Sequence, residues 1–117
     1  MLSISFKKAG NSEANVFFYR EKSFAGSAGL VKVLVSGQEI GKLGIGEFEK
    51  FKVKPGQTSI KAAKGDVLQL GATEDAYSFA AEAGKSYYFI LSFKQGLFTA
   101  GWKVMETSER GFKSAVQ

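Results

Sequence analysis

Residues 86–95 read S-Y-Y-F-I-L-S-F-K-Q and form the most hydrophobic stretch of the chain. Tyr87, Phe89, Leu91 and Phe93 stand at every second position within it. This period of two places the four side chains on one side of a β-strand, because successive strand residues point to opposite faces. The stretch therefore predicts a strand that contributes several aromatic side chains to a core.

Two further stretches, at residues 30–36 and 47–54, alternate in the same way. Their aliphatic and aromatic residues are separated by lysine, leucine or glutamate, as in strands with one buried face. We expect the alternating apolar residues of the three strands to share one core. These residues are Val31, Val33, Val35, Phe51, Val53, Phe89, Leu91 and Phe93.

Turn-forming residues separate the strands at short, regular intervals. Gly37 and Gly56 each stand in a tight reversal of the chain, so both are expected to adopt positive φ. The pattern predicts an all-β, immunoglobulin-like two-sheet β-sandwich of about seven to nine strands. Residues 15–117 would form this single domain, residues 1–14 an N-terminal arm or edge segment, and a short C-terminal helix would begin after Ser108.

The composition excludes several kinds of chemistry. The chain of 117 residues contains neither cysteine nor histidine. It therefore cannot build a Ser-His-Asp triad, a thiol nucleophile or a cysteine zinc site. Paired carboxylates, such as Glu47 with Glu49, lack a third partner in a recognisable loop and are expected to be solvated. We expect a protein that is not an enzyme and that needs no cofactor or metal.

Two glycine-containing segments bear a superficial likeness to nucleotide loops. Residues 83–86 read A-G-K-S, but a phosphate-binding loop would need glycine at the position of Phe79 and a helix afterwards. Gly41, Gly44 and Gly46 do not have the spacing of a dinucleotide loop. Both segments are expected to be turns.

Charge and hydropathy limit the partners. The net charge is +5, and 14 of the 16 basic residues are lysine. This lysine bias disfavours a specific nucleic-acid partner, since base and phosphate recognition usually depends on arginine. No stretch approaches the roughly 20 apolar residues of a transmembrane helix, and residues 1–10 do not resemble an export signal.

Two candidate surfaces follow from the strand patterns. Lys50, Lys52 and Lys54 would form a basic stripe for an anionic lipid headgroup, glycan or nucleic acid, or else a solvated face that protects a sheet edge. The second candidate is an apolar outer face that would contact another protein, unless part of the chain covers it. Its residues are Leu30, Leu34, Tyr88 and Ile90.

The order of these segments resembles an uncharacterised bacterial family of small exported or lipoprotein β-sandwich domains. The resemblance rests on V-F-F-Y-R at 16–20, V-K-V-L-V-S-G-Q-E-I-G-K-L at 31–43, F-K-V-K-P-G at 51–56, A-G-K-S-Y-Y-F at 83–89 and E-R-G at 109–111. A weaker similarity links the G-x-x-I-G and P-G portions to PEGA-type envelope domains.

The resemblance implies a non-enzymatic binding or structural module of the bacterial cell envelope or periplasm that acts through a sheet face or edge. Its partner would be another protein. The alternative is an anionic-ligand binder that uses the lysine stripe. Because this chain shows neither a signal nor a lipobox cysteine, a full-length chain of this sequence would instead be cytoplasmic.

Overall fold

The computed structural model describes residues 12–22, 29–64, 76–95 and 100–117, which form eight strands and one helix. The strands expected at residues 30–36, 47–54 and 86–95 are found to within one residue at each end, and the helix begins directly after its N-cap Ser108, as predicted. The elements are β1 (Ala14–Arg20), β2 (Val31–Val35), β3 (Gln38–Leu43), β4 (Phe48–Val53), β5 (Gly56–Lys64), β6 (Tyr77–Ala81), β7 (Ser86–Gln95), β8 (Ala100–Thr107) and α2 (Glu109–Val116).

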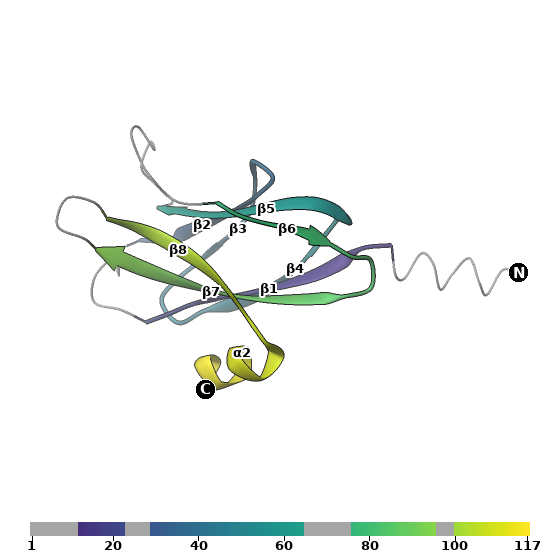
Figure 1. Cartoon of the computed structure of the whole chain (residues 1–117). Coiled ribbons are helices and arrows are strands. Elements are labelled where there is room, and N and C mark those ends of the chain that lie inside the picture. The colour runs from purple at the N-terminus through teal and green to yellow at the C-terminus, as the bar shows by residue number, and fades with distance from the viewer. Residues whose placement is uncertain (1–11, 23–28, 65–75, 96–99) are drawn as a thin grey trace, which may run out of the picture.

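The strands build two four-stranded sheets that pack face to face (Figure 1). One sheet has the order β4-β1-β7-β8 and the other the order β3-β2-β5-β6. All neighbours are antiparallel except β1 and β7, which run parallel. The two-sheet sandwich predicted from the strand periodicity is thus confirmed.

The core lies between the inner faces of the two sheets. Phe89 is fully buried there, and its ring centroid lies 5.4–5.6 Å from those of Phe18, Tyr77 and Phe79. Such offset and edge-on aromatic contacts add to the free energy of burying the rings. Among the eight predicted core residues, five are buried: Val31, Val33, Val53, Phe89 and Leu91.

The other three, Val35, Phe51 and Phe93, pack against the core but are only half-buried, so full burial was the wrong prediction for them. Phe51 belongs to β4, an edge strand with a neighbour on one side only. Val35 ends β2, and Phe93 is near the end of β7. Alternation assigns a side chain to a face, but the depth of burial depends on how far the facing sheet extends.

Gly41 lies within β3 and not in a turn, which corrects the expectation for this residue. A Cβ atom built on it would come within 2.5 Å of the Phe51 ring. Glycine therefore allows the ring of Phe51 from one sheet to lie directly against the backbone of the other.

The β2–β3 hairpin closes through a two-residue turn at Ser36 and Gly37, which have φ values of 50° and 85°. Two positive φ values in succession define the type I′ turn, whose twist matches that of the flanking strands. Gly56 has a φ of 121°, so positive φ is confirmed for both glycines. Gly56 follows the connection from β4 to β5, which joins the two sheets rather than closing a hairpin.

Replacing Gly37 with valine should lower the free energy of unfolding by more than about 1 kcal/mol. A Cβ atom at this position would meet nothing within 4 Å, so the cost would come from the backbone conformation alone. Urea denaturation of the variant measures it. Ser36→Asn is the matched control, because asparagine tolerates positive φ, and it should be neutral or stabilising. Equal stability of G37V and the parent would contradict this account of the turn.

Candidate functional site

The candidate lysines lie on and just beyond β4, an edge strand of the first sheet. Lys50 is paired with Phe17 of β1 and Lys52 with Asn15, so both belong to the outer face of the sheet. Lys54 follows the last residue of β4. All three are exposed, and no ion pair between described residues involves them. The structure thus places the predicted stripe along one free sheet edge.

Aromatic side chains accompany the lysines on this outer face. The Lys50 Nζ lies 5.8 Å from the centre of the Phe17 ring, within reach of a cation–π interaction. Phe48, two residues before Lys50, keeps 54% of its surface exposed. The β4 edge therefore combines cationic groups with an accessible aromatic ring, a combination that the lysine pattern alone did not indicate.

Helix α2 covers the centre of the same outer face (Figure 1). Its buried residue is Phe112, whose ring centroid lies 5.5–6.4 Å from four rings of the sheet. These rings belong to Phe17, Tyr19, Phe48 and Tyr88. The helix thus closes the middle of the aromatic face and leaves its β4 margin open to solvent.

The predicted protein-contact residues do not form one surface. Tyr88 and Ile90 are half-buried on the outer face of the first sheet, where Tyr88 stacks on Phe17 at 4.8 Å and contacts α2. Leu34 alternates with core residues of β2 and so faces outward from the other sheet, and Leu30, directly before β2, is 47% exposed. The four residues consequently lie on opposite sides of the sandwich.

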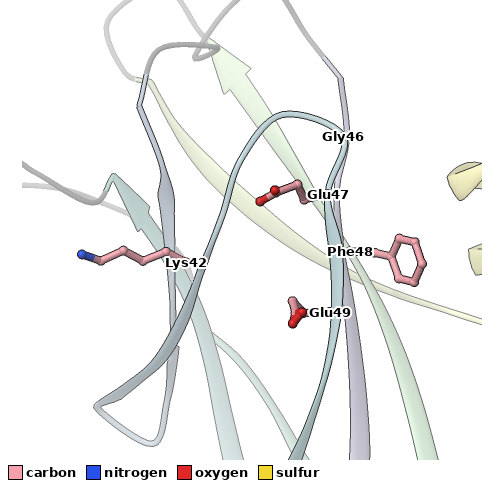
Figure 2. Close-up of a pocket in the computed structure, with 5 residues that line it drawn as sticks. All are labelled: Lys42, Gly46, Glu47, Phe48 and Glu49. Carbon is pink, nitrogen blue, oxygen red and sulfur yellow. The ribbon is translucent and has the colours of Figure 1, made fainter.

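A hollow of about 490 Å³ lies beside the start of β4 and is lined by Lys42, Gly46, Glu47, Phe48 and Glu49 (Figure 2). Phe48 points away from Glu47 and Glu49 in this view. The Oε1 atom of Glu47 accepts a hydrogen bond from the backbone N–H of Gly44. No group of three or more potential metal ligands occurs among the described residues. Glu47 therefore belongs to the surface turn before β4, whereas Glu49 lies within β4, and both are exposed.

The burial of the Arg20 side chain was not predicted from the sequence. Arg20 is the last residue of β1 and is only 1% exposed. Its Nη1 donates to the carbonyl oxygens of Gly29 at 2.8 Å and Leu43 at 3.0 Å. Its guanidinium lies 5.0 Å from the centre of the Trp102 ring. Burial lowers the pKa of Arg20, and the nearby charge of Glu47 partly opposes this shift.

A signal for this burial was present in the strand period. Arg20 continues the inward series of Ala14, Val16 and Phe18, which are all buried. A guanidinium can be buried when fixed acceptors satisfy its donors, and it remains charged. Arg20 thus joins the loop before β2 to the end of β3, and so fixes the connection that leads into β4.

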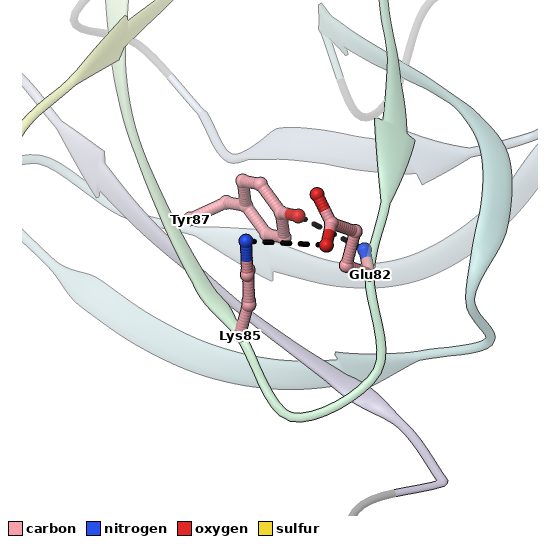
Figure 3. A network of polar contacts seen from close by, with 3 residues as sticks. All are labelled: Glu82, Lys85 and Tyr87. Atoms are coloured by element: carbon pink, nitrogen blue, oxygen red, sulfur yellow. Dashed lines mark hydrogen bonds and ion pairs between the residues drawn. The ribbon is translucent and has the colours of Figure 1, made fainter.

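The A-G-K-S segment forms the turn between β6 and β7, as expected. Lys85 pairs with Glu82 at 3.1 Å, and the backbone N–H of Glu82 donates to the hydroxyl of Tyr87 at 2.9 Å (Figure 3). A strand follows instead of a helix. Lys85 therefore forms its ion pair within the β6–β7 turn, and the segment lacks the helix N-terminus of a phosphate-binding loop.

At the edges opposite β3 and β4, a hydrogen bond joins the two sheets. The hydroxyl of Tyr77 in β6 donates to the Glu106 carboxylate in β8. This hydrogen bond, together with burial, raises the pKa of Tyr77. The contact links an edge strand of each sheet. The stripe of Lys50, Lys52 and Lys54 and the hollow beside Phe48 lie at the opposite edges, along β3 and β4.

Comparison with known families decides the relationship of this chain. The family model described as "Protein of unknown function (DUF2846)" matches residues 10–102. The chain belongs to this family. The match confirms the resemblance to an uncharacterised family and contains β4 and Arg20, whereas α2 lies beyond the matched DUF2846 region. Neither a curated protein nor a solved structure matches the chain significantly.

The described part of this DUF2846 chain holds no helix long and apolar enough to cross a membrane.

Proposed function

We propose that this protein is a non-enzymatic binding module of the bacterial cell envelope that attaches to an anionic partner through the β4 edge. The envelope setting rests on the resemblance to exported and lipoprotein domains. The mode of binding rests on one observation: Lys50, Lys52 and the exposed Phe48 lie together on β4, an edge strand that has a strand neighbour on one side only.

One feature favours binding over simple protection of the edge. Lysines alone would suffice to discourage edge-to-edge pairing. They do not account for Phe48, an exposed aromatic ring in the same strand. Cationic groups beside an accessible apolar ring can bind a partner that combines negative charge with apolar surface. The separation of Leu30 and Leu34 from Tyr88 and Ile90 also makes the expected single apolar contact face a weaker candidate.

The triple variant Lys50→Gln/Lys52→Gln/Lys54→Gln should lose most of its binding to an anionic polymer such as dextran sulfate at low salt. The interaction should be weak in the parent and should decline as salt rises, because exposed charges are screened over about 8 Å at physiological ionic strength. Co-sedimentation or calorimetry at two salt concentrations measures both effects. The stability of the triple variant should remain close to that of the parent.

A charge-matched control is available away from β4. Lys32 and Lys61 lie on β2 and β5 of the other sheet, and Lys103 lies on β8, at the opposite edge of the first sheet. Their triple replacement by glutamine removes the same net charge but leaves β4 intact. It should retain most of the binding. Equal losses in the two triple variants would show a general charge effect and would overturn the assignment to β4.

A further inference from the structure

A second hollow, of about 400 Å³, opens between the two sheets at the far end of β4. The turn residue Ser36, the β3 residue Gln38 and the β5 residues Gln57 and Thr58 line its polar part. Thr58 donates its hydroxyl proton to the carbonyl oxygen of Gly56 at 2.9 Å. The side chains of Gln38 and Gln57 form no hydrogen bond with other described residues. The hollow therefore presents two amide groups and the Ser36 hydroxyl to a ligand, whereas Thr58 is buried.

The charge of this hollow is positive. Lys52 and Lys54 line it, and Glu13 is the acidic residue among its lining. Neither lysine takes part in an ion pair between described residues. Lys50 thus stays outside this hollow, Lys52 borders it from the outer face of its sheet, and Lys54 lies at its wall just beyond the end of β4.

The remaining wall is aliphatic and includes Val35, Ile40 and Pro55. The described residues that line the hollow include no aromatic side chain. They therefore offer no platform on which a nucleic-acid base could stack. Amides and a hydroxyl beside aliphatic carbons match the alternating hydroxyl and C–H groups of a sugar ring. The volume is in the lower part of the range for small-ligand sites, about 300–1,000 Å³.

We propose that this hollow binds an acidic saccharide, a sugar unit that carries a carboxylate, with Gln38 and Gln57 binding its hydroxyl groups and Lys54 its charge. The assignment rests on the proposed anionic binding at β4 and adds the class of ligand and the place where one unit is held. Lys50 and Phe48 would contact the continuing polymer.

The test uses tetragalacturonate, which carries a carboxylate on each ring, and its methyl ester, which does not. Calorimetric titration should detect the acid and show at least about tenfold weaker binding of the ester. The double variant Gln38→Ala/Gln57→Ala should bind the acid about tenfold more weakly, as expected for the loss of two hydrogen bonds. Chemical-shift changes in the side-chain amides of both glutamines should accompany binding by the parent.

Lys54→Gln and Lys103→Gln form a matched pair, since each removes one exposed lysine and Lys103 lies on β8, at the opposite edge of the first sheet. Lys54→Gln should weaken tetragalacturonate binding severalfold, and Lys103→Gln less than about twofold. Equal effects of the two, with no effect of the glutamine changes, would overturn this inference and leave the anion-binding edge to the dextran sulfate comparison. Binding of dextran sulfate by the parent without any binding of tetragalacturonate would also overturn this inference alone. If the parent binds neither probe, the proposed function is overturned as well.

Discussion

Replacing Phe89 with alanine is expected to lower the free energy of unfolding by about 3–5 kcal/mol, the usual cost of removing a buried phenylalanine ring. Phe89 is fully buried in β7, where its ring contacts aromatic residues of both sheets: Phe18 from β1, and Tyr77 and Phe79 from β6. The variant would leave a cavity at the place where the two sheets meet. Urea denaturation of the parent and the variant measures the loss.

Phe48→Ala is the matched control, because it removes the same side chain from a position that is 54% exposed. Its cost should be clearly smaller, since most of that ring already contacts water and its recorded ring contact is with Phe112 at 6.3 Å. Similar losses in the two variants would contradict the assignment of β7 to the centre of the core.

Replacing Arg20 with methionine is expected to lower the free energy of unfolding by about 2–4 kcal/mol. The carbonyl oxygens of Gly29 and Leu43 would lose a charged donor, and a hydrogen bond of this kind contributes roughly 1.5–3 kcal/mol. The guanidinium would also no longer lie on the Trp102 ring. Methionine keeps an apolar stem of similar length and relieves the cost of burying a charge, which offsets part of the loss.

Arg110→Met supplies the control, since Arg110 is the only other arginine in the sequence and is exposed on α2. Its replacement should change the free energy of unfolding by less than about 0.5 kcal/mol. The fluorescence of Trp102, the only tryptophan, should shift in the Arg20 variant but not in the Arg110 variant. A stability of R20M equal to that of the parent would show that the two carbonyl contacts contribute nothing to folding.

Arg20 also matters for the proposed binding edge. Its backbone N–H donates to the carbonyl oxygen of Glu47, and its carbonyl oxygen accepts from the N–H of Gly46. Side chain and backbone of one residue thus hold both ends of the connection between β3 and β4. The position of Phe48 and Lys50 depends on this connection, so a change at Arg20 should weaken anion binding together with stability.

The sequence by itself determined the class of fold and the positions of the strands. Period-two alternation is a local property, and β7 was predicted with its observed bounds at residues 86–95. The cap of α2 was equally local: Ser108 accepts a hydrogen bond from the backbone N–H of Gly111 at 3.0 Å. The positive φ values of Gly37 and Gly56 followed from turn chemistry, which needs no distant partner.

Only the tertiary structure decided which strands are neighbours and which faces are covered. The parallel pairing of β1 with β7 joins residues about 70 positions apart, and no local pattern specifies such a partner. The same pairing places β4 at a sheet edge and puts Tyr88 beneath Phe112, so an apolar residue that alternation assigned to an outer face is half-buried. Arg20 is buried because carbonyl groups from two separate segments meet its donors, and the second hollow is lined by residues that come from both sheets. Local periodicity fixes the side of a strand on which a residue lies, whereas the packing of distant segments decides whether that side meets water, a ligand or the core.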